Sequence, residues 1–368
     1  MILAAAKTVA ADIQIANILC LAISFAAPLM LVALGGMFSE RSGIINLALE
    51  GIMIIGALIA CLTLRYLNDP ENIKVIGDKL LANGTIKHNA EMSWGEANPQ
   101  LAVLIAVGVA ALSGAIFSLF LAFAAINLKA DQTIGGTALN QFAPAFAVVL
   151  AWAIQGQSGT DIAIPNWVRI RPDQLGISGK PNQDFLPTLF KQFHLTTLIA
   201  IILLIVVVIV LYRTRFGLRL RACGEHPQAA DSVGINVYKM RYAGVIISGV
   251  LGGIGGFAYV IAAGTSFSAS VGGYGFLALA VMIFGNWKPL QIMGCAFFFA
   301  LFRVLSTQYT LIPFLDFTEQ FKKIGITTKP GNIYNMIPYI VTMIVLVLTS
   351  KKSRAPKAEG IPYDKGQR

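Results

Sequence analysis

Charged side chains are scarce in this sequence. Only 12% of its 368 residues are Asp, Glu, Lys or Arg, whereas 56% are hydrophobic, and the mean hydropathy is +0.70. A soluble globular protein carries about 25% charged residues, so this share is too small to cover the surface of a water-soluble chain of 39.4 kDa. The composition therefore predicts a bundle embedded in a lipid bilayer and excludes a soluble enzyme.

Residues that hold metals or nucleotides are also sparse or wrongly spaced. The four cysteines and three histidines lack the spacing of a metal site, a disulfide framework or a catalytic pair. The glycines between residues 249 and 256 lack the strand and the downstream acid of a dinucleotide site. Small residues four apart are instead typical of closely packed membrane helices. We expect no catalytic residue, metal or cofactor, so any ATP that drives this protein must bind to another subunit.

Long apolar runs account for most of the chain. A transmembrane helix needs about 20 largely apolar residues, and the runs of this length predict an all-α, polytopic bundle of about nine helices, with a range of about eight to ten. The expected spans are residues 15–37, 44–64, 101–127, 133–154, 195–212, 242–263, 267–285, 289–307 and 334–349. We expect residues 1–350 to form one transmembrane domain.

The basic residues are concentrated in two segments outside these runs. Residues 213–241 and the tail at 351–368 each carry six Lys or Arg and two acids, so together they hold +8 of the net charge of +10. The long loops at 65–99 and 156–194 are nearly balanced. The positive-inside rule therefore predicts a cytoplasmic 213–241 loop and C-terminus, and two extracytoplasmic loops. Orientation in the membrane explains the excess charge without any nucleic-acid partner.

Ionisable groups at membrane depth cost roughly 2.5–3.5 kcal/mol at the centre of a helix, so each one indicates a specific need. Glu50 lies in the second run, and Asn46 precedes it by one helical turn, so we expect both on one helix face. Just upstream, Glu40 and Arg41 interrupt the apolar pattern. Two interpretations stay open here: a tight cytoplasmic turn capped by Ser42, or a broken helix that lines a transport path.

Two further polar islands lie inside the apolar pattern. Residues 132–141 end in the amides Asn140 and Gln141, which either link helices by hydrogen bonds or bind a polar solute. Residues 263–276 are rich in Gly and Ser and can break a helix, as residues 38–43 do after the first span; paired interruptions are typical of transport sites built from internal repeats.

These islands supply the candidate lining of a solute path. The expected path residues are Glu40, Arg41, Asn46, Glu50, Asn140, Gln141, Ser266 and Tyr274. An uncharged ring-containing solute also needs an aromatic face, for which Phe142, Phe267 and Tyr274 are candidates, although each also suits a packed core.

The basic loop contains the most specific stretch of the chain. Pro227 suits the first turn of a helix, and Gly234 can end it. A helix of little more than one turn is not stable alone, so we expect it to dock against a neighbour. Joined to two spans, it can pass a push from a soluble partner to the bundle.

This stretch resembles the coupling-helix motif in permease subunits of ABC importers of the branched-chain amino acid, ribose and nucleoside type. The matching residues are Gly217, Arg221, Ala222, Gly224, Glu225, His226, Pro227, Ala229, Ala230, Gly234 and Ile235. Residues 39–53 resemble the nucleoside permeases specifically, which carry Glu-Arg-Ser-Gly, Asn-Leu and Glu-Gly here, whereas sugar-type relatives carry Gly-Ile-Asp-Leu-Ser-Val-Gly. Residues 274–289 fit the second-half motif of the family.

The resemblance implies an all-helical permease of the type II importer kind, with broken or re-entrant helices, in a bacterial plasma (inner) membrane. It also implies a cytoplasmic ABC ATPase, a second identical or homologous permease, and an extracytoplasmic substrate-binding lipoprotein. The loops at 65–99 and 156–194 are larger than is usual in the family. The residues it assigns to ATPase coupling are Arg221, Gly224, Glu225, His226, Pro227, Ala229, Ala230 and Gly234.

A nucleoside is the favoured solute. The alternatives are ribose or another simple sugar, and an ion-coupled secondary transporter that uses Glu50 and Asp131 as proton carriers. A secondary transporter needs neither an ATPase nor the short helix in the 213–241 loop.

Overall fold

The fold is known from a computed structural model of the chain. The parts of the chain that it describes are residues 11–80, 86–156, 159–264, 266–308 and 355–365, with isolated positions between 334 and 344.

Six helices within the described residues are long and apolar enough to cross a membrane. They are α1 (Ala11–Arg41), α2 (Leu49–Asn68), α4 (Pro99–Ile126), α5 (Gln132–Gln155), α7 (Leu195–Arg213) and α10 (Val237–Ala263). Two further apolar helices are α11 (Tyr274–Phe284) and α12 (Pro289–Gln308). The expected helical membrane bundle is confirmed. The expected count of about nine spans is not, because α11 is too short to span and half of residues 334–349 lie outside the described residues.

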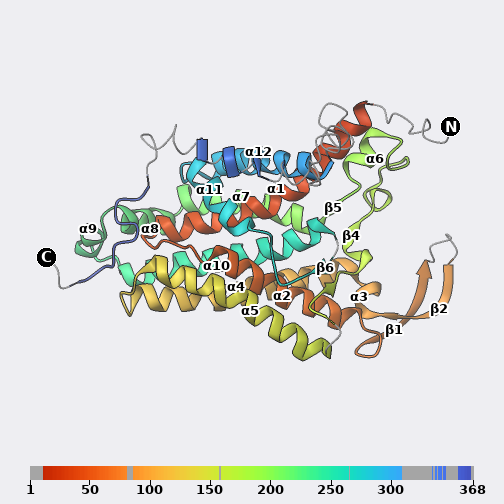
Figure 1. The fold of residues 1–368 in the computed structure, drawn as a ribbon, viewed down its shortest axis with the longest axis horizontal. Coiled ribbons are helices and arrows are strands. Elements are labelled where there is room, and N and C mark those ends of the chain that lie inside the picture. Colours follow the sequence, from red (N-terminus) through yellow and green to blue (C-terminus); the bar gives the residue numbers. More distant parts are fainter. Residues whose placement is uncertain are drawn as a thin grey trace, which may run out of the picture.

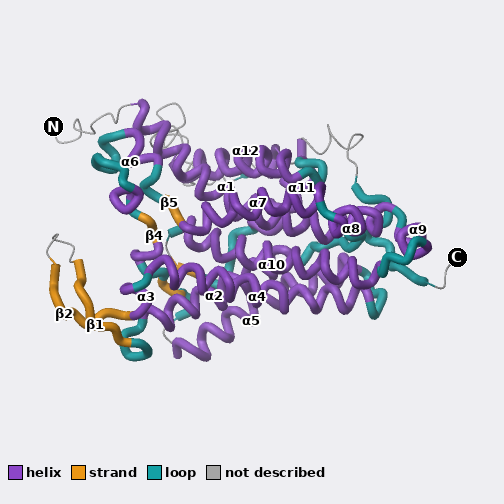
Figure 2. The backbone as a smooth tube through the Cα atoms, turned by 180° about the vertical axis from the view of Figure 1, so that it is seen from behind, coloured by secondary structure: helices purple, strands orange, loops and turns teal. Residues whose placement is uncertain are grey.

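The two ends of the bundle carry different structures (Figures 1 and 2). One end holds α8 (Arg215–Glu225), α9 (Pro227–Ser232) and the C-terminal segment. The other end holds the antiparallel hairpin of β1 (Lys74–Leu80) and β2 (Ile86–Ser93), which projects from the bundle. The smaller elements are α3 (Trp94–Ala97), β3 (Ile162–Ala163), η2 (Asn166–Val168), β4 (Arg169–Ile170), η3 (Pro172–Leu175), α6 (Phe185–Leu189), β5 (Phe193–His194) and β6 (Ser266–Phe267). The basic loop and the balanced loops thus lie at opposite ends, as the charge pattern predicts.

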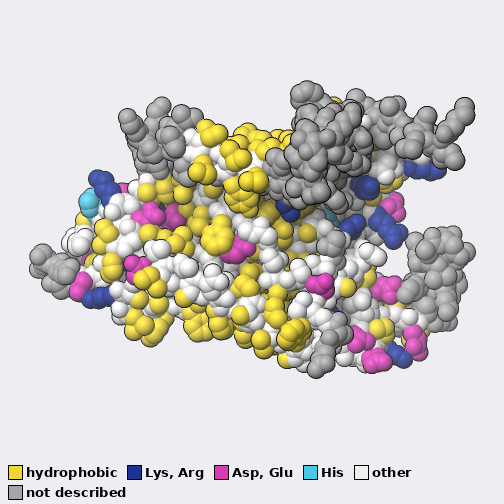
Figure 3. Space-filling model, in the orientation of Figure 1, with side chains coloured by type: hydrophobic (Ala, Val, Ile, Leu, Met, Phe, Trp, Pro, Cys, Tyr) yellow, Lys and Arg dark blue, Asp and Glu magenta, His cyan; other side chains and the backbone are white. Residues whose placement is uncertain are grey.

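Helix α10 is the centre of the bundle and packs along α1, α2 and α4. Its glycines make this possible, because a Cβ at Gly253 would overlap the carbonyl oxygen of Ala110 in α4, and one at Gly256 would overlap the carbonyl oxygen of Met53 in α2. Gly249 and Gly253 thus lie against α4, and Gly252 and Gly256 lie against α2, so each pair of glycines four apart sets one helix contact. Hydrophobic side chains cover much of the middle of the face drawn in Figure 3, and most of the Lys and Arg side chains visible there lie towards the ends.

Residues 42–48 and residues 266–273 are not helical, so the helices α2 and α11 begin later than their apolar runs. The first delay has a local cause: the Asn46 side-chain oxygen accepts a hydrogen bond from the N–H of Ala48 (3.0 Å), which competes with helix formation. Asn46 therefore precedes α2, and the expectation that it shares a helix face with Glu50 is wrong. Ser42 does not cap α2 either, since its hydroxyl donates to the carbonyl of Ser39.

Candidate functional site

The two interrupted segments meet at Glu50. This residue lies in the first turn of α2, and its carboxylate accepts hydrogen bonds from the N–H of Gly273 (2.9 Å) and of Gly275 (2.6 Å), at the start of α11. The first N–H groups of a helix have no partner within the helix and favour a negative charge. A carboxylate that is only 8% exposed is thus satisfied by backbone donors, and it fixes α2 to α11.

Glycine is required where α11 begins. A Cβ at Gly275 would lie 2.5 Å from the Cα of Glu50 and 2.8 Å from its carboxylate, and Gly273 has a φ of +79°. The Gly-rich break that the sequence shows at 263–276 therefore brings the backbone of α11 close to the backbone and the carboxylate of Glu50.

Two amides hold the first break in place. The Asn140 side chain accepts from the N–H of Gly51 (2.8 Å) and donates to the carbonyl of Leu47 (2.6 Å), so it fixes α5 to the start of α2. The Asn46 side chain donates to the hydroxyl of Ser248 in α10 (2.8 Å). Of the two interpretations of Asn140, the geometry matches the interhelical link.

Tyr274, the first residue of α11, is packed rather than exposed. Its ring centre lies 4.3 Å from that of Tyr259 and 6.4 Å from that of Phe25, and its side chain is 3% exposed. The guanidinium of Arg303 in α12 lies near both tyrosines. Tyr259, Tyr274 and Arg303 therefore form a polar cluster at the start of α11.

Glu40 forms a second junction at the other end of α11. Its carboxylate accepts a hydrogen bond from the indole N–H of Trp287 (2.6 Å), in the turn between α11 and α12, and the guanidinium of Arg41 donates to the carbonyl of Trp287 (2.9 Å). The carboxyl of Glu359 in the C-terminal segment lies next to that of Glu40. Helix α11 is therefore held at its beginning by Glu50 and just past its end by Glu40.

Gln141 differs from these residues because it is exposed on α5. Thr133 and Thr137 are also exposed and precede it at intervals of four residues, so the three form one polar stripe along the helix. Ser266 is half-buried in β6, where it pairs with Ala163. The structure thus separates the expected path residues into an interior set that joins helices and an exposed residue, Gln141, on a polar face.

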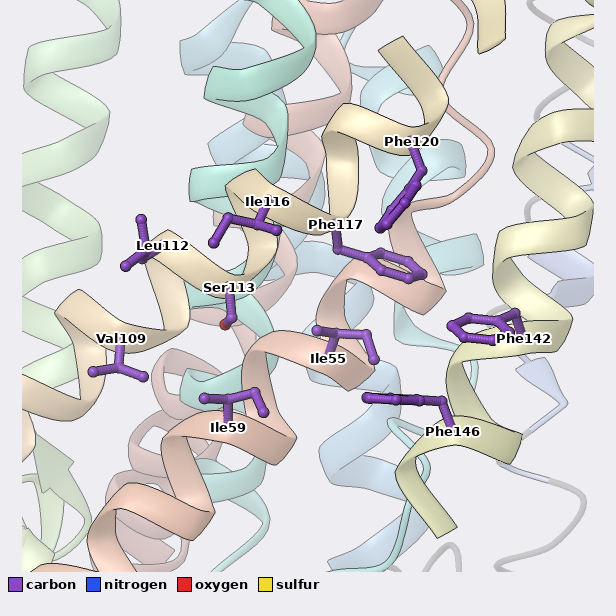
Figure 4. A pocket seen from close by; sticks show the side chains of 10 residues that line it. All are labelled: Ile55, Ile59, Val109, Leu112, Ser113, Ile116, Phe117, Phe120, Phe142 and Phe146. Atoms are coloured by element: carbon purple, nitrogen blue, oxygen red, sulfur yellow. The ribbon is translucent and has the colours of Figure 1, made fainter. Parts of the chain in front are cut away.

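A groove between α2, α4 and α5 opens beside the aromatic residue Phe142 (Figure 4). It has a volume of about 460 Å³ and is lined by Ile55, Ile59, Val109, Leu112, Ser113, Ile116, Phe117, Phe120, Phe142 and Phe146. The hydroxyl of Ser113 donates to a backbone carbonyl of its own helix. A nucleoside or a sugar in this groove would leave its polar groups unpaired, which is costly. Phe142 therefore lines an apolar groove rather than a site for a polar solute, and Phe267 and Tyr274 are buried in the core.

The short helix expected in the basic loop, α9, has the bounds that the sequence indicates. Helix α9 begins at Pro227 and ends at Ser232, and Gly234 follows with a φ of +82°. The side chains of His226 and Ala229 are exposed, whereas Ala230 is buried.

Helix α8 rests on the turn between α1 and α2. A Cβ at Gly224 would overlap the carbonyl oxygen of Arg41, so the end of α8 and the end of α1 are in backbone contact. Arg221 places its guanidinium 5.4 Å from the ring centre of Tyr212. Glu225 is half-buried.

The C-terminal segment is packed against this end of the bundle, although the sequence suggests only a basic tail. The N–H of Ala358 donates to the carbonyl of Gly224 (2.9 Å), and the N–H of Gly360 donates to the carbonyl of Gly43 (3.3 Å). The only hint in the sequence is the interleaved apolar residues between positions 355 and 363. Among the described residues, no group of three or more His, Cys, Asp or Glu could hold a metal ion.

Comparison with known proteins places these features in a family. Residues 18–347 match the family model described as "Branched-chain amino acid transport system / permease component". The chain is 39% identical to the guanosine ABC transporter permease protein NupQ of Bacillus subtilis, over 94% of this chain and 95% of the relative. It is also 39% identical to the nucleoside ABC transporter permease protein NupC of Lactococcus lactis, over 97% and 98%.

A shorter match concerns a second permease. The nucleoside ABC transporter permease protein NupB of the same L. lactis strain is 31% identical over 30% of each chain. No solved structure matches significantly. The family implies an ATPase and a substrate-binding partner, and its members are transport subunits rather than enzymes. The chain belongs to the branched-chain amino acid transport system permease family, and it is a multi-pass ABC transporter permease subunit.

Proposed function

We propose that this chain is one of the two permease subunits of a bacterial ABC importer for nucleosides. The observation that carries the proposal is the 39% identity to guanosine and nucleoside permeases over nearly the whole chain. Residues 39–53, which resemble the nucleoside type, also contain both Glu40 and Glu50.

The end of the bundle with α8 and α9 faces the cytoplasm in this proposal, because the 213–241 loop and the C-terminal segment carry most of the excess positive charge. A cytoplasmic ATPase binds to the exposed side of α9. The substrate-binding lipoprotein docks at the opposite end, where the β1–β2 hairpin and the elements between α5 and α7 lie.

The coupling step follows from the contacts of α8. Movement of α9 is passed through α8 to the α1–α2 turn, because Gly224 lies directly against the carbonyl of Arg41. The turn carries Glu40 and Glu50, which hold both ends of α11. The two interrupted segments therefore move together when the ATPases close, and they open the path to the other side.

The path itself runs along α5 and is completed by the second permease, a homologue of this chain. Thr133, Thr137 and Gln141 are polar and exposed on a helix of 24 residues. The hydroxyl of Thr137 donates to the carbonyl of Thr133 (2.7 Å), but the amide of Gln141, two turns into the helix, is a polar group that is costly to leave against lipid. The buried residues Asn46, Glu50 and Asn140 shape this wall, whereas Gln141 contacts the solute.

The secondary-transporter alternative has little support from Asp131. Its carboxylate caps α5 by accepting hydrogen bonds from the N–H of Thr133 (2.8 Å) and Ile134 (3.0 Å). These bonds lower the pKa of Asp131, so it stays ionised, which does not suit a proton carrier.

The test is uptake by the complete transporter in proteoliposomes. We expect labelled guanosine and other nucleosides to be imported only with ATP and the ATPase, and an excess of free ribose not to compete. Competition by ribose at the same concentration would favour a sugar permease, and uptake without the ATPase would favour a secondary transporter.

Adjacent residues on α5 provide a matched pair for the path. Gln141→Ala should raise the KM for nucleoside and leave the thermal stability of the protein unchanged, because the side chain is exposed. Asn140→Ala should lower the stability, because it removes two interhelical hydrogen bonds. Unchanged uptake in Gln141→Ala would remove α5 from the path.

A further inference from the structure

The C-terminal segment ties together three parts of the cytoplasmic end (Figure 1). We name residues 356–364 the C-terminal strap. Its backbone bonds to α8 at Gly224 and to the α1–α2 turn at Gly43. The guanidinium of Arg241, in α10, donates to the carbonyl of Ile361 (3.0 Å). One segment thus joins α8, α10 and the turn that lies between Glu40 and Glu50.

Tyr363 of the strap is part of the buried surface on which α9 packs. It is 5% exposed and belongs to a small buried cluster with Cys223 of α8, Ala230 of α9 and Val237 of α10. The hydroxyl of Tyr363 also lies near the carboxylate of Asp231 of α9. Because a helix of six residues has no stability of its own, α9 is held by this cluster, in which Tyr363 is the largest buried side chain.

Glu359 connects the strap to the other side of the turn. Its carboxyl lies against that of Glu40, which in turn accepts the hydrogen bond from Trp287 after α11. Two neighbouring carboxylates repel each other when both are ionised, so a proton on one of them favours this contact. The strap therefore reaches from the helix that binds the ATPase to the residue that holds the end of α11.

We propose that the C-terminal strap is a coupling element, in which Tyr363 and Glu359 are positioning residues that make α9, α8 and the α1–α2 turn move as one body. The inference rests on the proposed function, in which a push on α9 drives the change in α11. Without Tyr363, the buried cluster that holds α9 loses its largest side chain. ATP hydrolysis then continues, but less of the movement of α9 reaches the α1–α2 turn.

The experiment uses the complete transporter, with its ATPase, second permease and binding protein, in proteoliposomes. Uptake and ATP hydrolysis are measured together for the unaltered chain, Tyr363→Ala, Tyr363→Phe and the control Lys365→Ala, an exposed residue just after the strap. We expect Tyr363→Ala to lower the solute imported per ATP hydrolysed by about fivefold or more, the lower end of coupling between sites. Lys365→Ala should leave this ratio unchanged.

Modification of Cys223 reports directly on the strap. Cys223 is 0% exposed beneath Tyr363, while the other three cysteines lie in α1, α2 and α12. A membrane-impermeant maleimide followed by peptide mass spectrometry should modify Cys223 faster in Tyr363→Ala. A mutation that only lowered expression would change neither this rate nor the ratio.

An unchanged ratio of uptake to ATP hydrolysis in Tyr363→Ala overturns the inference. If that variant loses ATP hydrolysis as well, Tyr363→Phe decides: it keeps the ring but loses the hydroxyl near Asp231, so a lowered ratio supports the strap and an unchanged ratio overturns it. Ala229→Glu, on the exposed side of α9, tests the proposed function separately. If Ala229→Glu reduces the ratio and the Tyr363 variants do not, only the strap inference fails; if Ala229→Glu has no effect, coupling through α9 fails.

Discussion

Two buried glutamates flank the α1–α2 turn, and they are held by different kinds of partner. Glu50 is bound by backbone N–H groups at the start of α11, whereas Glu40 is bound by the side chains of Trp287 and Glu359. Backbone donors at a helix start cannot turn away without unwinding the helix, but an indole and a carboxyl on other segments can separate while every helix stays intact. The turn therefore has a permanent junction at Glu50 and a releasable one at Glu40.

Glu50→Gln should have the largest effect on stability. The substitution removes the charge from two hydrogen bonds and turns an amide NH₂ group towards one backbone N–H, and bonds to charged groups contribute about 1.5–3 kcal/mol each. We expect the free energy of unfolding to fall by about 3 kcal/mol, measured as thermal unfolding of the solubilised protein. The control is Glu91→Gln on the exposed hairpin. Equal shifts for both variants would show that the Glu50 junction is not special.

Gly275→Ala tests the same junction from the α11 side. The added methyl group meets the backbone of Glu50, and such overpacking costs about 1–3 kcal/mol. Gly294→Ala is the matched control, because a Cβ there has no atom within 4 Å and alanine favours a helix over glycine. We therefore expect Gly275→Ala to lower the stability and Gly294→Ala to raise it, which distinguishes the effect of close backbone approach from that of helix propensity. A stable Gly275→Ala chain would contradict the observed contact.

Trp287→Phe should have a smaller effect, because it acts on the releasable side. The phenyl ring fills most of the indole site but cannot donate to Glu40, which costs about 1–2 kcal/mol. Trp152→Phe, at a side chain that is 55% exposed, serves as the control in the same unfolding assay. If Trp287→Phe destabilised the protein more than Glu50→Gln, the assignment of permanent and releasable junctions would be reversed.

Much of this arrangement follows from local sequence. Apolar runs give the membrane helices, and Pro227 with Gly234 gives the bounds of α9, because those features depend on residues within a few positions. The need of Glu50 for a partner is also readable, since a carboxylate at membrane depth must be satisfied.

The identity of each partner is not readable in the same way. Glu50 binds Gly273 and Gly275, which lie in the other half of the chain. The hydropathy pattern does not indicate which interrupted segments contact each other. Asn46 was expected on the face of Glu50 because the apolar run hides the hydrogen bond that delays α2. The C-terminal strap is missed because its contacts are largely through backbone groups and one tyrosine, which leave almost no pattern in the sequence.

The smallest effect expected is a dependence of strap docking on pH. Burial raises the pKa of Glu359 from its ordinary value of 4.5 to about 7, so the docked strap binds a proton that the released strap gives up. Docking is therefore strongest below pH 4.5 and weakens as the pH rises to about 7. The charged or titratable groups nearest to this site are Glu40 and Arg41 at the end of α1, and Arg241 of α10, which bonds to the strap next to Glu359.

Modification of Cys223 measures this dependence if each rate is divided by that of a chain ending before residue 355, because the ionisation of the thiol then cancels. The ratio should rise between about pH 5 and about pH 8, as Glu359 loses its proton and the strap is released more often. Glu359→Gln, which is neutral throughout, should remove the rise and keep the ratio low. If the ratio still rises with pH in Glu359→Gln, the proton belongs to another group. The Glu40 junction would then not be released by the ionisation of Glu359.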